Sequence, residues 1–184
     1  VIREAGPGWD SSKPLRDQEA WPEHAAFMNA LVDEGFVELG GPVDGGPKTL
    51  QHILEVSAGA LEVERVGIWL YSADRQALTC KALFDRGAGV HSSGEELAAR
   101  DHPAYFEALA TEDVIAAADA CLDPRTAEFR DSYLIPLGIT SMLDVPLRSA
   151  GRLGGVLCHE HRGSPRLWSS DEQFFAMAVA NLVA

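Results

Sequence analysis

Residues 132–184, SYLIPLGITSMLDVPLRSAGRLGGVLCHEHRGSPRLWSSDEQFFAMAVANLVA, decide the fold. Two apolar runs, ITSMLDVPL and RLGGVLCHEH, are joined by RSAGR, and this pattern predicts an antiparallel β-hairpin. Both runs are apolar at successive positions, so we expect a central place in a sheet that is covered on both faces. Ser169 and Glu172 predict a capping box, which opens a helix that continues through Phe174, Ala178 and Leu182.

Upstream, the spacing of apolar residues over 49–61 predicts a helix. The stretch RVGIWLYSADRQALTCKALF then predicts two strands around a turn at residues 73–76. The next stretch, DRGAGVHSSGEELAARD, is polar and rich in glycine, so we expect a loop over residues 85–101.

The middle of the chain alternates short helices with one strand. HPAYFEALATE predicts a helix that follows Pro103, and DVIAAAD predicts a strand. Asp123 and Pro124 predict the start of a second helix, which runs through Phe129 and Tyr133 to Gly138. This order of elements predicts an α+β domain with a mainly antiparallel sheet.

Composition restricts the function. A net charge of -13 opposes binding to phosphate backbones, so we expect no nucleic-acid partner. No apolar run reaches the roughly 20 residues that a membrane crossing needs, and VIREAGPGWD lacks the pattern of a secretory signal, so we expect a cytoplasmic protein that does not span a membrane. The three cysteines are far apart in sequence, which indicates reduced thiols rather than a disulfide framework or a zinc motif.

Residues 48–184 resemble a GAF domain, and in particular the GAF modules that precede bacterial sensor histidine kinases. The matching segments are VERVGIWLYSAD, DPRTAEFRDSYLIPLGITSMLDVPL, GGVLCHEH and RLWSSDEQFFAMAVANL. The resemblance implies a central antiparallel sheet, with the terminal helices on one face, where such domains commonly form homodimers. It also implies a lid of loops and short helices, over residues 91–138, that encloses a ligand pocket on the other face.

The chain departs from two ligand-binding groups of that family. Members that bind cyclic nucleotides carry an Asn-Lys pair after the last strand, where this chain has His159 and Glu160. Bilin-carrying members need a cysteine in a suitable pocket loop, and Cys121 lacks the rest of that signature. We therefore predict no cofactor.

Residues 1–47 resemble part of a YCII-like domain in WPEHAAFMNALVDEGFVELGGP, with a helix over 22–34 and a strand in FVEL. His24 matches a helix histidine of that family's active-site cleft. The breaker cluster GGPVDGGPK predicts a linker, so the expected division is 1–47 and 48–184. A natural fusion, an engineered chimera and a misassembled sequence are all consistent with the joint.

Candidate pocket residues are the aromatic, soft and polar side chains nearest the presumed cleft: Trp69, Arg86, Tyr105, Phe106, Asp119, Phe129, Ser132, Tyr133, Met142 and His159. No metal site is expected, because neighbouring strand residues such as Cys158 and His159 point to opposite faces. No catalytic residue is assigned.

The sequence thus predicts a non-catalytic sensory or regulatory domain of a bacterial signal-transduction protein. It would bind an unknown small molecule, form a homodimer through its terminal helices, or do both, and act on an output domain such as a histidine kinase. The alternatives are a YCII-like enzyme module that uses His24 and a purely structural dimerisation module.

Overall fold

The computed structural model describes residues 12, 13, 17, 19, 22 and 26, residues 47–149 and residues 151–184. Residues Gly46–Ala184 form a compact unit. The predicted strand FVEL and His24 lie outside the described residues, as does most of the predicted helix over 22–34. The YCII-like resemblance and the boundary at residue 47 therefore stay predictions.

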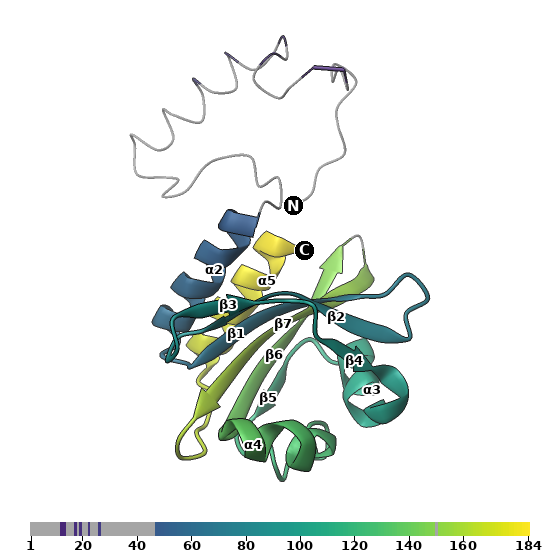
Figure 1. The fold of residues 1–184 in the computed structure, drawn as a ribbon, viewed down its shortest axis with the longest axis vertical. Helices are drawn as coiled ribbons and strands as arrows, with labels where there is room; N and C mark the ends of the chain where they lie inside the picture. Colours follow the sequence, from purple (N-terminus) through teal and green to yellow (C-terminus); the bar gives the residue numbers. More distant parts are fainter. Residues whose placement is uncertain are drawn as a thin grey trace. The chain divides into compact units, whose positions relative to one another are not determined.

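The compact unit is built on one antiparallel sheet with the strand order β3-β2-β1-β7-β6-β5, and β4 also pairs with β2 (Figure 1). The α+β class predicted from the sequence is confirmed. The strands are β1 Arg65–Tyr71, β2 Ala77–Asp85, β3 Val90–Ser92, β4 Glu96–Ala98, β5 Ile115–Ala117, β6 Ile139–Ser149 and β7 Arg152–Arg162.

The hairpin predicted from the last third of the chain forms the centre of this sheet. β6 and β7 pair from Ile139 with Arg162 to Ser149 with Arg152. β7 also pairs with β1 along its other edge. Gly155 is required at this second edge, because a Cβ atom there would overlap the carbonyl oxygen of Trp69.

Helices α2 Pro47–Ala60 and α5 Ser170–Val183 lie side by side on one face of the sheet (Figure 1). The capping box of α5 is confirmed: the Ser169 amide donates to Glu172 Oε2 at 2.7 Å, and the Glu172 amide donates to Ser169 Oγ at 3.3 Å. The buried cluster on this face includes Leu54, Leu157 and Ala176.

The sequence predicts that the stripe of Phe174, Ala178 and Leu182 packs against the helix over residues 49–61, but in the structure this stripe lies on the exposed side of α5. Phe174 is 67% exposed and Leu182 is 53% exposed, whereas Ala176 and Ala180 are buried against the sheet. The small alanines let the helix approach the strands closely. Nine of the ten residues from Phe174 to Val183 are apolar, so periodicity could not select the buried side of this helix.

The opposite face carries the lid, which contains α3 Pro103–Thr111 and the short turns Ala99–Asp101, Ala127–Phe129, Arg130–Leu134 and α4 Ile135–Leu137. The single helix predicted from Asp123 to Gly138 is confirmed only in part: helical turns run from Ala127 to Leu137, but as a 3-10 turn, a π-helix over Arg130–Leu134 and α4. Pro136 has no amide proton to give to the carbonyl of Ser132, so a regular ladder of helical hydrogen bonds cannot run through this segment. Gly138 ends it in the left-handed conformation, with φ 69°.

The expected loop over residues 85–101 is also corrected, because β3 and β4 form there on the outer edge of β2. Both strands are only three residues long and lie in a stretch rich in polar residues and glycine, so their own sequence does not predict them. They form because β2 offers unpaired backbone groups along that edge.

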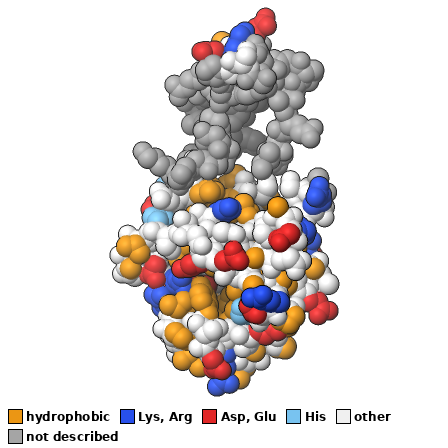
Figure 2. All heavy atoms as spheres, turned by 45° about the vertical axis from the view of Figure 1, so that its right-hand side comes forward, with side chains coloured by type: hydrophobic (Ala, Val, Ile, Leu, Met, Phe, Trp, Pro, Cys, Tyr) orange, Lys and Arg blue, Asp and Glu red, His pale blue; other side chains and the backbone are white. Residues whose placement is uncertain are grey.

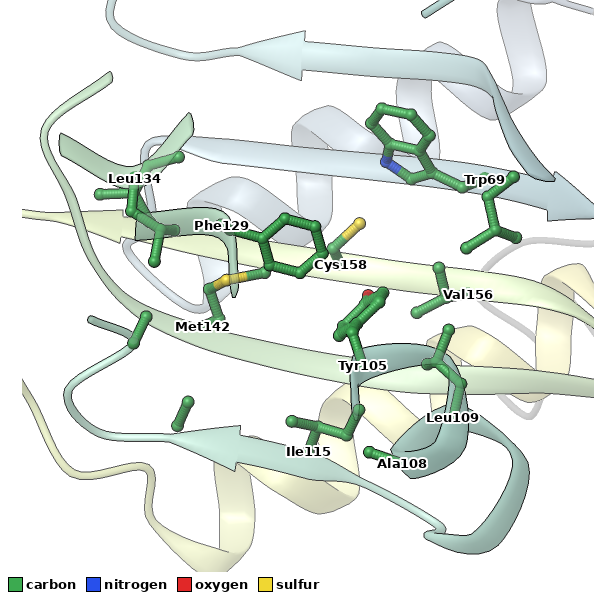
Figure 3. Packing of buried hydrophobic residues seen from close by; sticks show 14 of the residues in the cluster. Trp69, Tyr105, Ala108, Leu109, Ile115, Phe129, Leu134, Met142, Val156 and Cys158 are labelled. Carbon is green, nitrogen blue, oxygen red and sulfur yellow. The ribbon is translucent and has the colours of Figure 1, made fainter. Parts of the chain in front are cut away.

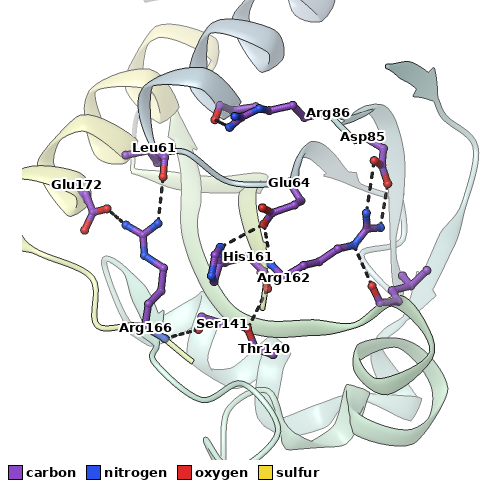
Figure 4. A network of polar contacts seen from close by, with 12 residues as sticks. Leu61, Glu64, Asp85, Arg86, Thr140, Ser141, His161, Arg162, Arg166 and Glu172 are labelled. Carbon is purple, nitrogen blue, oxygen red and sulfur yellow. Dashed lines mark hydrogen bonds and ion pairs between the residues drawn. The ribbon is translucent and has the colours of Figure 1, made fainter. Parts of the chain in front are cut away.

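Polar contacts join the strand ends, the lid and α5 at one end of the domain (Figure 4). Arg162 pairs with Asp85 at 2.9 Å and donates through Nε to the carbonyl of Leu137 in α4 at 2.9 Å. Arg166 donates to the carbonyl of Leu61 at 3.2 Å and pairs with Glu172 of the capping box. The face that carries α3 shows acidic, basic and apolar side chains interspersed (Figure 2).

Candidate functional site

A cavity of about 150 Å³ lies between the sheet and the lid. Strands β1, β2, β4, β6 and β7 form one side of it, and α3 and the turns over 127–134 form the other. Because the exposed Ser132 is among its lining residues, the cavity reaches the surface. Its lining consists of Trp69, Leu78, Leu97, His102, Tyr105, Phe129, Ser132, Tyr133, Met142, Val156, Cys158 and Glu160.

The alternation of β7 places three of these side chains. Val156, Cys158 and Glu160 line the cavity, whereas Leu157 and His159 are buried on the helix side of the sheet. Figure 3 shows Val156 and Cys158 on the same side of the sheet as Phe129 and Tyr105 of the lid. One strand thus supplies both the cavity wall and the core beneath the terminal helices.

The two main lid segments support each other. The carboxylate of Glu128 accepts hydrogen bonds from the amides of Ala104 and Tyr105 at 3.1 and 3.3 Å, so it caps the first turn of α3. The ring of His102 stacks on Phe129, with 4.3 Å between their centroids. Tyr105 and Phe129 are therefore held in place over the sheet by contacts within the lid.

A buried polar group closes one end of the cavity. Tyr133 donates to Glu160 Oε1 at 2.8 Å and accepts from Arg65 Nη1 at 3.0 Å, while Arg65 Nη1 lies 3.0 Å from Glu160 Oε2. Burial raises the pKa of Glu160, although Arg65 acts in the opposite direction. Burial and the adjacent Glu160 also raise the pKa of Tyr133, so its hydroxyl stays protonated and acts as the donor to the carboxylate.

A second buried carboxyl group supports the lid from below. Tyr105 donates to Asp144 Oδ2 at 2.6 Å. Burial raises the pKa of Asp144 to about 8, even though the hydrogen bond from Tyr105 lowers it. Asp144 lies outside the lining of the cavity, so its contact positions the Tyr105 ring rather than offering a polar group to a ligand.

The residues predicted for the pocket fall into two groups. Six of them line the cavity: Trp69, Tyr105, Phe129, Ser132, Tyr133 and Met142. The other four lie outside the lining. Arg86 donates to the carbonyl of Ala58, and Phe106 packs on Tyr71. Asp119 accepts from the amide of Cys121, and His159 is buried beneath α2.

Sequence reasoning missed Leu78, Leu97, His102, Val156, Cys158 and Glu160. Three of them could have been predicted from the alternation of side chains along β7. Val156, Cys158 and Glu160 lie on one face of the strand, and His159 lies on the other. Leu97 lies on β4 and Leu78 pairs with it, so their place depends on a short edge strand that the sequence did not indicate.

His159 belongs to a buried serine–histidine contact on the helix side of the sheet. Its Nε2 lies 2.9 Å from Ser57 Oγ of α2, and its Nδ1 lies 3.0 Å from the carbonyl of Leu143. Nδ1 must carry the proton, because a carbonyl oxygen can only accept, so Ser57 donates to Nε2. Both side chains are fully buried, and a substrate in the cavity cannot reach them through the sheet. The contact is structural and joins α2 to the central strand.

The described residues hold no group of three or more His, Cys, Asp or Glu side chains placed to bind a metal ion. None of the helices in the described part of the chain has the length and apolar character that a membrane crossing requires.

The model of the GAF domain family matches residues 47–184, so the chain belongs to the GAF domain family. Its fold is similar to that of the blue-light absorbing PixJ GAF domain of Thermosynechococcus elongatus, with a TM-score of 0.59 and 19% identity over 71% of this chain and 77% of that chain. No match was found among the curated proteins.

Two further solved structures have the same fold. A domain assigned to a two-component sensor histidine kinase of Sinorhizobium meliloti 1021 has a TM-score of 0.56 and 16% identity, over 78% of this chain and 90% of that chain. The GAF domain of an Acinetobacter phosphoenolpyruvate-protein phosphotransferase has a TM-score of 0.55 and 18% identity, over 70% of this chain and 74% of that chain. The matched family model begins at residue 47, and the YCII-like resemblance of residues 1–47 gains no support from it.

The burial of His159 predicts how stability depends on pH. Burial lowers the pKa of His159 to about 4, whereas the unfolded chain protonates this side chain near pH 6.5. As the pH falls from about 6.5 to about 4, the unfolded state takes up a proton that the folded state refuses, so the fold loses up to about 3 kcal/mol. In His159→Gln this loss is absent, and the stability difference between the wild-type protein and the variant narrows on acidification.

Urea unfolding at about pH 7 and about pH 4.5 measures that difference. The exposed His52 lies on the same helix as Ser57, and His52→Gln is the control, for which the difference should stay constant. A constant difference for His159→Gln would contradict the account of this contact.

Proposed function

We propose that residues 47–184 form a non-catalytic sensory module of a cytoplasmic signal-transduction protein, which binds a small ligand in the cavity and pairs with a second copy through α2 and α5. The observation that carries the proposal is a cavity whose roof consists of short lid segments on a continuous central sheet. Membership of the GAF family supports a regulatory role, and the sensor kinase assignment of one structural neighbour supports an output domain such as a histidine kinase.

The arrangement of β7 suggests how occupancy of the cavity would reach the terminal helices. Glu160 lies in the cavity wall, and the adjacent His159 contacts Ser57 of α2 on the other face. A ligand that prefers one position of the Glu160 carboxylate would shift the backbone shared by both residues and thereby bias α2. Such coupling amounts to about 1–3 kcal/mol in typical allosteric proteins.

The cavity is small for a bilin, the kind of ligand that some GAF domains carry. Its volume of about 150 Å³ lies below the roughly 300–1,000 Å³ of common ligand pockets. Cys121 packs against the lid-side core without lining the cavity. The proposal therefore concerns a ligand about the size of a single ring and includes no bilin.

A panel of small metabolites tests ligand binding by thermal shift. One or more compounds should raise the melting temperature by about 7–9 °C when present at ~100 times Kd. Leu97→Trp, at the half-buried rim of the cavity, should abolish the shift by filling the space, whereas Leu122→Trp, on an exposed part of the lid, should preserve it. If no compound changes the melting temperature and the wild-type protein is a dimer, the result would instead favour the purely structural dimerisation module.

The dimer face is tested on α5. Phe174 and Leu182 leave an apolar stripe exposed, and Val56 is exposed on the neighbouring α2. Phe174→Glu should convert a dimer to a monomer in light scattering at tens of micromolar, because a charge would be buried without a partner. Leu167→Glu, at a site that is 85% exposed before the helix begins, should leave the dimer intact. A wild-type monomer at the same concentration would rule out this face as a dimer interface.

A further inference from the structure

The cavity is walled by aromatic rings from separate parts of the fold. Trp69 comes from β1, Tyr105 from α3, and Phe129 and Tyr133 from the turns of the lid. Tyr105 and Phe129 meet at 77° with their centroids 4.8 Å apart, and Phe129 and Tyr133 are tilted by 60° at 6.3 Å. Steeply inclined rings face the space from several directions, whereas stacked rings would cover one another. Figure 3 shows Tyr105 and Phe129 grouped at the centre of this cluster, with Trp69 farther along the sheet.

The same cavity has a negative end. Glu160 is the carboxylate among its described lining residues, and its partner Arg65 lies behind it, outside the lining. Glu160 Oε2 has the ion pair with Arg65 but no well-aligned hydrogen bond in the described structure. Arg65 has a second carboxylate nearby, because Asp85 Oδ2 lies 3.7 Å from its Nε. The positive charge of Arg65 is thus shared between two carboxylates.

The electrostatic balance of the buried groups favours an added positive charge. The buried carboxyl group of Glu160 and the carboxylate of Asp85 both lie close to the single guanidinium of Arg65. Burial raises the pKa of Glu160, because Arg65 and Tyr133 only partly replace the hydration that its ionised form loses. A cation beside Glu160 would offset that deficit, and an anion would increase it.

The size of the cavity fits a compact ligand. An apolar cavity of about the same volume admits benzene, and a tetramethylammonium ion has a similar size. Quaternary and methylated ammonium ions bind to aromatic ring faces within about 6 Å, and they retain apolar methyl groups that suit an otherwise apolar wall.

We propose that the ligand of this cavity is a small organic cation, with a methylated ammonium group held among Trp69, Tyr105, Phe129 and Tyr133 and facing the carboxylate of Glu160. This inference rests on the proposed function and names its ligand class. The inclined rings and the carboxylate favour a cation over a neutral molecule of the same shape. The compact volume limits the size of the ligand.

Choline and its neutral carbon isostere, 3,3-dimethylbutan-1-ol, test the charge at constant shape. Isothermal titration of the full chain should show choline binding about tenfold tighter than the isostere, which corresponds to the strength of a desolvated cation–π contact. Phe129→Leu removes one ring and keeps an apolar side chain, and it should reduce choline affinity about fivefold with little effect on the isostere. Phe84→Leu is the matched control, because Phe84 packs on the helix side of the sheet.

A measurement on the wild-type protein covers the case in which Phe129→Leu does not fold. Nuclear Overhauser effects should connect the methyl protons of choline with ring protons of Tyr105, Phe129 or Tyr133. Equal or tighter binding of the isostere, no binding of choline at about 10 mM, or methyl contacts outside these rings would each overturn the proposal. If another compound from the metabolite panel binds in those cases, the sensory function stands and only the ligand class fails; if the whole panel is flat, both fail.

Discussion

The contact among Arg65, Tyr133 and Glu160 is the interaction on which the arrangement of the domain depends. It joins β1, β7 and the lid within hydrogen-bonding distance, at the point where the cavity meets the centre of the sheet. Each group needs the other two, because a buried charge or hydroxyl without a partner costs about 1–3 kcal/mol or more. The lid segment over residues 130–134 is a single π-helical turn, and the hydrogen bond from Tyr133 to Glu160 ties this turn to the sheet.

Strand β7 connects this contact with the helices on the other face of the sheet. Its alternation sets Glu160 in the cavity wall and the adjacent His159 against Ser57 of α2. Gly155 permits β1 to approach β7 closely, and Trp69 of β1 supplies another wall of the same cavity. The strand is buried on both sides. A displacement of its cavity side therefore moves side chains that are packed on the helix side.

The sequence predicted the parts of the fold whose local signals agree with their tertiary surroundings. The β6–β7 hairpin, the capping box of Ser169 and Glu172, and the helix after Pro103 all have such signals, and all are confirmed. The segment before Gly138 is helical from Ala127 to Leu137 but does not form one regular α-helix, because Pro136 lacks the amide proton that such a helix needs. β3 and β4 could not be predicted from their own residues, because their pairing partner β2 determines them.

The cavity shows the same division. Aromatic side chains such as Tyr105 and Phe129 could be proposed from their place in the chain, and they line the cavity. For the polar end of the cavity the sequence analysis proposed His159, whereas its neighbour Glu160 lines the cavity. The alternation of β7 places Glu160 on the same face as Val156 and Cys158, and this is the face that the lid covers.

Hydrogen exchange of Tyr133→Phe tests the central claim most directly, since the substitution removes one hydroxyl and leaves the ring. The account predicts that backbone amides of residues 127–137 exchange about tenfold faster than in the wild-type protein, because the lid loses its anchor, while amides of α5 exchange at the same rate. Unchanged exchange over residues 127–137, or an equal increase throughout the domain, would contradict the claim that this contact holds the lid on the sheet.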